Sequence, residues 1–371
     1  MYCVNRINMI RLKYKNDTKM IKFNQKEKKI IDIFLKGNKE MQSSAVYQEM
    51  MKLGEEMSQV TIKRLLSKMV DKDVLIMEGK GRSTVYKLNI KGRVFAEISA
   101  QEYLSIEPDK RFGFQEYNFD LFSLFPLEVF LKEELEALNK ATLEYKRRIK
   151  GISSIIEKKE LERLIIELSW KSSKIEGNTY TLLDTEKLIL KNQLAEDKTQ
   201  QETQMILNHK DAFNFTYNNK NFFKTMTKEN LEELHKILTK GLGVNLGMRK
   251  SPIGISGSVY RPLDNVYQIN EAIEALIRVI KKMESTYAKS MTALLGISYI
   301  QPFEDGNKRV SRIMANALLM ANGLAPLSYR SVDEKEYKEA VLTFYELNSI
   351  VPFKKIFIEQ YDFSARNYAV K

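Results

Sequence analysis

The sequence predicts a mainly α-helical protein that begins with a smaller module of helices and paired strands. From residue 111 onward, most segments place apolar residues at the three- and four-residue spacing of amphipathic helices. Residues 21–95 instead combine short helical patterns with two short strand patterns around a basic turn. At 371 residues the chain exceeds one ordinary domain, so two or more domains are expected.

The N-terminal module is predicted from its capping residues. After a basic tail at residues 1–20, two helical patterns close at Gly37 and Gly54, and a third opens at the capping serine Ser58. The turn Gly-Lys-Gly-Arg at residues 79–82 then joins two strand patterns. Three short helices followed by a two-stranded wing resemble a winged helix-turn-helix domain over residues 21–95.

That resemblance implies a recognition helix at Ser58–Val70 and a set of DNA contacts on the helix and the wing tip, namely Lys63, Arg64, Lys68, Lys80 and Arg82. Charge supports a polyanion partner. Residues 1–100 hold 21 lysine and arginine residues against 11 aspartate and glutamate residues, or +10 of the chain's net +12. Winged helices also bind proteins, and lysine excess alone is a weak signal, so a protein partner stays open.

Composition excludes several other classes of protein. Cys3 is the only cysteine, which rules out a disulfide framework and a cysteine metal cluster. His209 and His235 are the only histidines, too few for a multi-histidine zinc site. No apolar run is long enough to span a bilayer, and residues 1–15 lack the apolar core of a secretory signal. We therefore expect a cytoplasmic protein with no membrane contact.

A linker is expected at residues 96–110, and helical patterns follow it to residue 371. One interruption stands out at residues 247–265, which are rich in Gly, Pro and Ser and alternate apolar with polar residues. This pattern is typical of a β-hairpin.

The stretch QPFEDGNKRVSR, residues 301–312, predicts an anion site. Its Asp-Gly-Asn turn precedes a helical pattern, and the first N–H groups of a helix have no internal partners and attract anions. Arg309 and Arg312 are three residues apart, so they share a helix face and can bind neighbouring phosphates. Asp305 beside phosphates suggests a Mg²⁺ ligand. The stretch therefore predicts a site for a di- or triphosphate.

The same stretch resembles the signature of the Fic/Doc (Fido) family, His-Pro-Phe-x-(Asp/Glu)-Gly-Asn-Gly-Arg-x-x-Arg. SSKIEGN, residues 172–178, is similar to the family's inhibitory signature (Ser/Thr)-x-x-x-Glu-(Gly/Asn), and residues 247–265 look like its flap. The resemblance covers residues 111–371. It implies a Fic-fold helical bundle with a β-hairpin flap and an inhibitory helix near residues 158–177.

The resemblance implies Mg-ATP as the ligand and a role for each matched residue. Asp305 would hold Mg²⁺, Phe303 would be buried, and the phosphates would be held by Gly306, Asn307, Lys308, Arg309 and Arg312. Glu176, within an inhibitory motif that includes Ser172 and Gly177, would pair with Arg312 and hold ATP in an unproductive pose, because a carboxylate competes with phosphate for one guanidinium. A target protein would bind along the flap residues Gly254, Ile255, Ser256 and Gly257.

Two departures from the signature bear on activity. Of the implied catalytic positions Gln301, Asp305 and Asn307, the first holds glutamine where the family has histidine, and an amide takes no proton near neutral pH. Lys308 replaces the usual glycine, as in Doc-like members. The sequence predicts transfer of AMP to a protein hydroxyl, autoinhibited by Glu176 and altered by Gln301. An inactive, nucleotide-sensing DNA-binding regulator and a Doc-like phosphotransferase stay open, as do the target protein and a homodimer.

Overall fold

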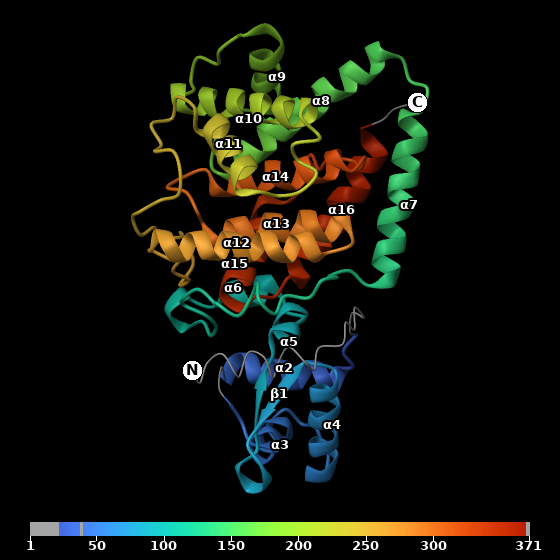
Figure 1. The fold of residues 1–371 in the computed structure, drawn as a ribbon, viewed down its shortest axis with the longest axis vertical. Helices are drawn as coiled ribbons and strands as arrows, with labels where there is room; N and C mark the ends of the chain where they lie inside the picture. The colour runs from blue at the N-terminus through green and yellow to red at the C-terminus, as the bar shows by residue number, and fades with distance from the viewer. Residues whose placement is uncertain (1–21, 38–39, 369–371) are drawn as a thin grey trace.

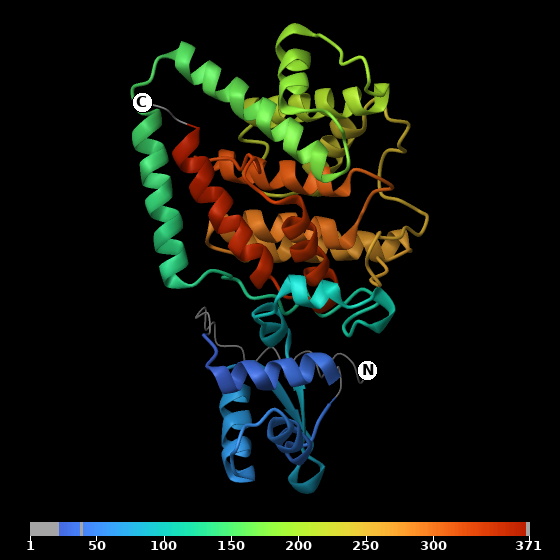
Figure 2. The ribbon, with the colours of Figure 1, turned by 180° about the vertical axis from the view of Figure 1, so that it is seen from behind.

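The structure, a computed structural model, describes residues 22–37 and 40–368, so the tail predicted at residues 1–20 lies outside the described residues. Helices dominate it, as predicted. They form two parts, a small N-terminal module (residues 22–95) and a larger helical body (residues 96–368), with the module at one end (Figures 1 and 2). None of the described helices combines the length and the apolar character needed to cross a membrane.

The N-terminal module contains three helices and one hairpin: α2 (Gln25–Gly37), α3 (Ser43–Lys52), α4 (Gln59–Asp71), β1 (Leu75–Glu78) and β2 (Val85–Leu88). Ser58 caps α4 as predicted, since its hydroxyl accepts from the Thr61 amide at 3.2 Å. The strands pair antiparallel, and a short 3₁₀ helix, Gly81–Ser83, lies in the turn between them. The apolar face of α4 is buried in the module through Ile62, Leu66 and Met69.

The segment expected as a linker packs on the helical body. After the short helix α5 (Ile90–Val94), it contains α6 (Ala100–Ser105) and a 3₁₀ turn (Pro108–Lys110). Glu346, at the end of α15 (Glu334–Leu347), is fully buried beneath it and accepts from the Tyr103 hydroxyl at 2.7 Å. The module is therefore joined to the body by a packed segment.

Two central helices organise the body, α13 (Thr286–Ile300) and α14 (Asn307–Ala321), which lie side by side (Figure 1). α13 is buried along almost its whole length, as expected for a helix that is apolar on every side. Gly296 permits close packing on it, because a Cβ atom there would lie 2.5 Å from Leu276. The surrounding helices, with α15, are α7 (Lys132–Ile149), α8 (Ser154–Ile175), α9 (Leu182–Lys191), α10 (Gln200–Asn218), α11 (Lys228–Thr239), α12 (Val266–Lys282) and α16 (Val351–Asn367).

The hairpin predicted at residues 247–265 is corrected by the structure. This segment keeps a turn at residues 256–257 but forms no paired strands, and its one bridge joins Arg261 to Glu116 outside it. Side chains satisfy carbonyl groups that a neighbouring strand would otherwise contact. The Arg249 guanidinium donates to the Ser251 carbonyl at 2.8 Å, and Arg111 donates to the carbonyl of residue 257 at 2.8 Å.

Candidate functional site

Two residues in the left-handed region shape the loop between α13 and α14. Gln301 ends α13 with φ 51°, and Gly306 caps α14 with φ 80°. A Cβ atom at position 306 would lie 3.2 Å from the Thr239 side chain, so glycine suits both the space and the backbone. The first helical hydrogen bond runs from the Val310 amide to the Gly306 carbonyl, which leaves the amides of residues 307–309 before the helical ladder. Such a helix start favours an anion.

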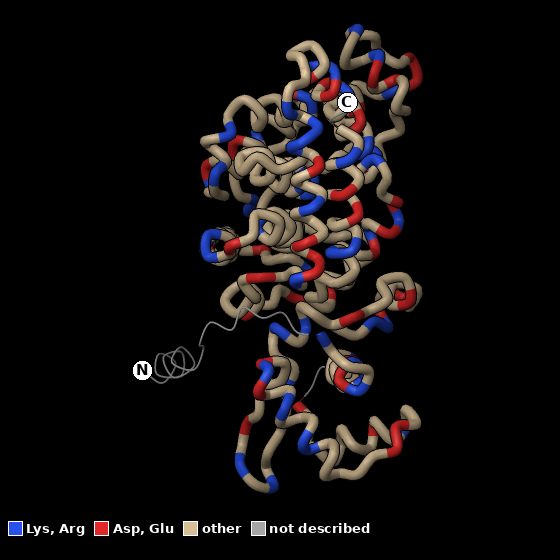
Figure 3. The backbone as a smooth tube through the Cα atoms, turned by 90° about the vertical axis from the view of Figure 1, so that its right-hand side faces the viewer, with Lys and Arg blue, Asp and Glu red and all other residues tan. Residues whose placement is uncertain are grey.

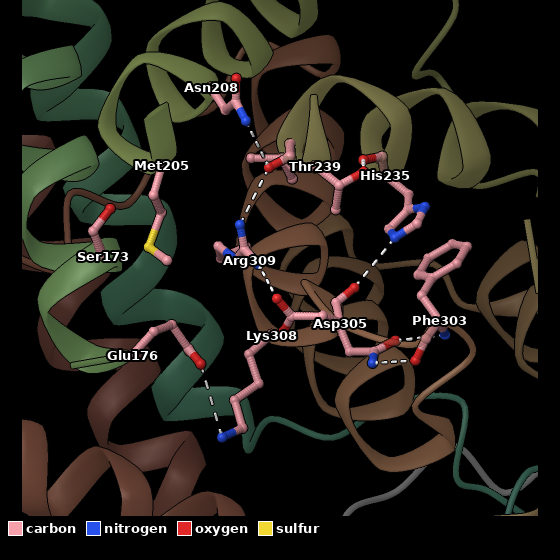
Figure 4. Close-up of polar contacts among 12 residues, drawn as sticks. Ser173, Glu176, Met205, Asn208, His235, Thr239, Phe303, Asp305, Lys308 and Arg309 are labelled. Atoms are coloured by element: carbon pink, nitrogen blue, oxygen red, sulfur yellow. Dashed lines mark hydrogen bonds and ion pairs between the residues drawn. The ribbon is translucent and has the colours of Figure 1, made fainter. Parts of the chain in front are cut away.

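Asn307 and Phe303 hold this loop in shape. The Phe303 amide donates to Oδ1 of Asn307 at 2.8 Å, and Nδ2 of Asn307 donates to the Phe303 carbonyl at 2.8 Å. Phe303 is buried, and its ring stacks on His235 with centroids 3.8 Å apart (Figure 4). The Asn307 side chain, predicted as a phosphate donor, is therefore engaged within the loop, and the backbone amides remain for an anion.

The two arginines of the stretch are both buried and have different partners. Arg309 donates from Nη2 to Oδ2 of Asp305 at 2.7 Å and from Nη1 to the Leu238 carbonyl at 3.2 Å (Figure 4). Arg312 donates from Nε to the Ser172 hydroxyl at 2.8 Å and from Nη2 to the Ser172 carbonyl at 2.9 Å. Its Nη1 atom is buried without a hydrogen-bond partner among residues 22–37 and 40–368. A buried donor of this kind is suited to an anion.

Glu176 follows α8 and lies opposite Arg312. Its Oε1 accepts from Nη2 of Arg312 at 2.9 Å. Its Oε2 lies 3.9 Å from Nζ of Lys308, as Figure 4 shows. Burial raises the pKa of Glu176, but Arg312 and Lys308 outweigh burial and hold the pKa below its ordinary value. Gly177, with φ 97°, then turns the chain away. The structure thus brings the predicted inhibitory residues Ser172 and Glu176 onto Arg312.

Gln301 is fixed by contacts on both sides. The side-chain Nε2 of Gln301 donates to the Ser298 carbonyl at 2.6 Å. The backbone carbonyl of Gln301 accepts from Nε of Arg249 at 2.7 Å. Arg249 is fully buried, and its amide donates to the Pro302 carbonyl at 2.9 Å. Arg249 therefore connects residues 247–265 to the loop. This role could not be predicted, because nothing in the local sequence distinguishes Arg249 from a surface cation.

Asp305, predicted to hold Mg²⁺, has an accessible carboxylate. Its side chain is 67% exposed and lies at the helix start beside Arg309. The described residues contain no cluster of three or more His, Cys, Asp or Glu side chains that could bind a metal without further ligands. One accessible carboxylate suits Mg²⁺, which takes one or two carboxylates and completes its coordination with water and phosphate oxygens.

Both histidines are buried and neutral near pH 7. Burial lowers the pKa of His235 to about 4, and its Nε2 lies 3.2 Å from the Asp305 carbonyl. Burial lowers the pKa of His209 to about 3, and its Nε2 lies 2.8 Å from the Ser172 hydroxyl. The contact of His209 with Ser172 could not be predicted, because it depends on how α8 packs on α10.

Two hollows in the surface lie along residues 247–265, and the predicted flap residues border one of them. Gly254 and Ile255 line a groove of about 410 Å³ together with Pro108, Asp109 and Gln115. A second hollow, of about 250 Å³, lies between residues 245–250 and Glu304. Ser256 and Gly257 form the turn of the segment. The predicted target-binding residues are therefore beside open surface.

The five cations predicted to contact DNA are exposed and form no salt bridge within the described part of the chain: Lys63, Arg64, Lys68, Lys80 and Arg82. Three lie on α4 and two at the hairpin turn. Figure 3 shows basic positions at this turn, at the end of the molecule. They are far from the loop that precedes α14 (Figure 1).

The fold and site define a class of protein, a helical bundle in which the start of a central helix has unpaired backbone amides, two buried arginines and a facing carboxylate. Residues 225–319 match the model of the Fic/DOC family. The protein therefore carries a Fic/DOC family domain.

Two curated relatives extend the comparison. A probable protein adenylyltransferase of Aquifex aeolicus (strain VF5) is 33% identical over 100 residues, which are 26% of this chain and 31% of that protein. The protein adenylyltransferase Fic of Nematostella vectensis is 28% identical over 194 residues, which are 50% of this chain and 44% of that protein. The chain thus spans less than half the length of these relatives.

Solved structures agree in fold. A Fic domain-containing signaling protein from Bacteroides thetaiotaomicron superposes with a TM-score of 0.54 at 17% identity, covering 63% of this chain and 96% of that one. Fic-1 from C. elegans superposes with a TM-score of 0.52 at 16% identity, covering 64% of this chain and 72% of that one. At such identity the likeness supports the fold alone.

Proposed function

We propose that this protein binds Mg-ATP at the start of α14 and transfers AMP from it to a hydroxyl group of a target protein, and that Glu176 inhibits the transfer. The observation that carries the proposal is the contact of Glu176 with Arg312 at 2.9 Å, beside the free amides of residues 307–309. A carboxylate on a buried guanidinium occupies the place of a phosphate. We call the cluster of Ser172, Glu176 and Arg312 the inhibitory contact.

The residues at the helix start have complementary tasks in this proposal. The amides of residues 307–309 would bind the α-phosphate, and Arg309 and Arg312 would bind the outer phosphates. Asp305 would hold Mg²⁺, which offsets phosphate charge when bound. The target hydroxyl oxygen bonds to the α-phosphorus while the bond from that phosphorus to the oxygen bridging the α- and β-phosphates breaks, so pyrophosphate leaves and the hydroxyl proton passes to solvent. The target segment would lie along residues 254–257.

Gln301 sets the speed of this reaction. The attacking hydroxyl must lose its proton, and the Gln301 amide cannot accept it near neutral pH. The missing general base lowers the rate on the order of 10²- to 10⁴-fold. A nucleophile that is already anionic, such as a phosphate group, would not need the base.

Replacing Glu176 separates binding from inhibition. Glu176→Gly removes the carboxylate that competes with phosphate, so we expect Mg-ATP to bind about tenfold or more tightly, by calorimetry. Incubation of this variant with lysate and α-labelled ATP should give a labelled protein. If neither the wild type nor Glu176→Gly binds Mg-ATP, the proposal fails.

Restoring the base tests the chemistry. In the Glu176→Gly background, Gln301→His should raise transfer of α-label by about 10²-fold or more, while the Kd for Mg-ATP changes little. Gln301→Ala serves as the control, because it alters the same position without adding a base. Equal transfer by the histidine and alanine variants would contradict an enzymatic role for this position.

A Doc-like phosphotransferase is a second candidate, and Lys308 favours it. This cation lies 3.9 Å from Glu176, so it can reach the anion that would replace Glu176. If Lys308 binds a phosphate group of ATP, the nucleotide would shift along the site, and the γ-phosphorus in place of the α-phosphorus would face the target hydroxyl. The α- and γ-labels decide between the candidates, because only γ-label reaches the target when ADP leaves.

An inactive regulator that senses nucleotide and binds DNA is the third candidate. Two observations favour it, Gln301 at the base position and the unpaired cations of the N-terminal module, whose three helices and hairpin match a winged helix in element order. It predicts Mg-ATP binding without turnover, and salt-sensitive DNA binding that changes with nucleotide. Absence of DNA binding at low salt would exclude it.

A further inference from the structure

A buried series of hydrogen bonds continues from Arg312 into α10. Nε of Arg312 lies 2.8 Å from the Ser172 hydroxyl, and that hydroxyl lies 2.8 Å from Nε2 of His209. Nδ1 of His209 lies 2.9 Å from the Met205 carbonyl and 3.3 Å from the Ser173 hydroxyl. The side chains of Arg312, Ser172 and His209 have no exposed surface. We call this the His209 series.

The direction of each hydrogen bond in the series is fixed by chemistry. The Met205 carbonyl only accepts, so Nδ1 of His209 carries the proton. Burial, together with the charges of Arg309 and Arg312, lowers the pKa of His209 to about 3, so the imidazole is neutral and its Nε2 accepts. Ser172 must then donate its hydroxyl proton to Nε2. Its oxygen lone pairs are left facing Arg312, whose Nε only donates.

We propose that His209 is a positioning residue for Arg312, which it orients through the Ser172 hydroxyl so that Nη2 faces the place of the outer phosphate. This inference rests on the proposed function and assigns His209 a part in it. The same orientation serves Glu176, because Nη2 is the atom that its carboxylate contacts at 2.9 Å. A guanidinium on a long side chain has many rotamers, and a fixed acceptor at Nε selects one plane.

Without His209, Ser172 loses its fixed orientation. A serine in a helix can turn its hydroxyl proton to the carbonyl four residues earlier, which rotates the lone pairs that Arg312 uses. Arg312 then keeps its charge but loses part of its alignment. The loss should weaken binding of an outer phosphate and leave binding of the α-phosphate unchanged.

The decisive experiment compares nucleotides in the Glu176→Gly background, where the competing carboxylate is absent. His209→Phe keeps a ring of similar shape without an acceptor, and we expect Mg-ATP to bind about three- to tenfold more weakly while AMP binds as before. In a Ser172→Ala background, His209→Phe should have no further effect. Equal weakening for AMP and Mg-ATP, no weakening of Mg-ATP, or additive effects of the two variants would overturn the inference.

A matched control probes damage to α10 itself. Thr216→Val removes another fully buried polar group from the same helix, a hydroxyl that donates to the Phe213 carbonyl at 2.8 Å. We expect it to change the Tm without changing the ratio of the Kd for AMP to the Kd for Mg-ATP. A change in that ratio as large as that of His209→Phe would count against a specific role for His209.

A spectroscopic measurement needs no variant of His209. The chain has only two histidines, so ¹⁵N-labelled imidazoles give two sets of signals in the full-length protein. The His209 signals should show the neutral tautomer with the proton on Nδ1, and Ser172→Ala should shift its Nε2 signal. The opposite tautomer would overturn the inference even if His209→Phe fails to fold. If Glu176→Gly binds no nucleotide, the proposed function fails while this measurement still decides the hydrogen-bond series.

Discussion

At the residue scale, Glu176 is shared by two cations of unequal strength. Arg312 has no exposed side-chain surface and donates to Glu176 at 2.9 Å, whereas Lys308 is 35% exposed and lies 3.9 Å away. Partly exposed ion pairs contribute about 0–1 kcal/mol, while hydrogen bonds to charged groups contribute about 1.5–3 kcal/mol. Arg312 therefore accounts for most of the inhibitory contact, and Lys308 adds a minor part.

Replacing Lys308 with the glycine of the family signature tests this ranking. In the wild type, Lys308→Gly removes a partner of Glu176 and a partner of the nucleotide together, so we expect less than about a fivefold change in the Kd for Mg-ATP. In the Glu176→Gly background only the second loss remains, and binding should weaken about two- to fivefold. Calorimetry measures both. Unchanged binding in the second background would mean that Lys308 does not face the nucleotide.

His209 also predicts how stability depends on pH. Its pKa is about 3 in the folded protein and 6.5 ordinarily, so the unfolded chain binds the proton more readily. The contribution of the neutral, buried His209 side chain to the free energy of unfolding is complete above pH 6.5 and is lost as the pH falls toward 3. Between pH 7 and pH 5 the loss from His209 is about 2 kcal/mol, and His209→Phe should remove this part while the similar loss from His235 remains. Urea unfolding at the two pH values measures the difference, and an equal decrease in both proteins would contradict it.

Single residues were predicted from sequence where the local pattern determines their environment. The Asp-Gly-Asn turn indicated the helix start, and Glu176 and Arg312 were paired by resemblance to two separate motifs. The engagement of the Asn307 amide with Phe303 was not predictable, because a turn signal does not show which atoms meet. The contact of His209 with Ser172 was not predictable either, since these residues are 37 positions apart and meet only when α8 packs on α10.

At the scale of elements, Glu346 connects three segments. Its buried carboxylate accepts from Tyr103 of α6 at 2.7 Å and from the Ser258 hydroxyl after the flap turn at 2.6 Å, and it pairs with Arg111 at 3.3 Å. The helices themselves follow from apolar periodicity and caps, so the sequence predicted them. The flap conformation did not follow, because one of its carbonyl groups is satisfied by Arg111, which is distant in the sequence, and another by the neighbouring Arg249, whose burial a strand pattern does not show.

Glu346→Gln should therefore destabilise the protein strongly. Arg111 would lose its charge partner in a buried place, and the Ser258 and Tyr103 hydroxyls would lose a charged acceptor. We expect the free energy of unfolding to fall by about 3 kcal/mol, measured by urea titration. Glu359→Gln on α16 is the matched control, because this carboxylate is 60% exposed and lies 4.0 Å from Lys355. Its effect should stay below about 0.5 kcal/mol. Equal decreases in the free energy of unfolding for the two variants would show that the buried contacts of Glu346 contribute no more to stability than an exposed ion pair.

At the scale of the whole molecule, the N-terminal module and the start of α14 lie apart (Figure 1). The chain's net charge of +12 would attract a polyanion anywhere, so affinity for DNA at one salt concentration does not locate the contact. The salt dependence of binding locates the contact, because each phosphate contact that is lost lowers the slope of the logarithm of the binding constant against the logarithm of the salt concentration by about 0.9.

Two matched double variants use this dependence. Lys63→Gln with Arg64→Gln removes two exposed cations from α4, and Lys281→Gln with Lys282→Gln removes two exposed cations from α12 in the body, so both lower the net charge equally. If α4 contacts DNA, the first should lower the slope by about 2 and weaken binding at low salt, while the second should leave the slope nearly unchanged. Fluorescence anisotropy with duplex DNA between low and physiological salt gives both slopes. Equal slopes for the two variants would mean that the charge of the chain attracts DNA without a defined contact on α4, and the regulator candidate would then lose its DNA-binding surface.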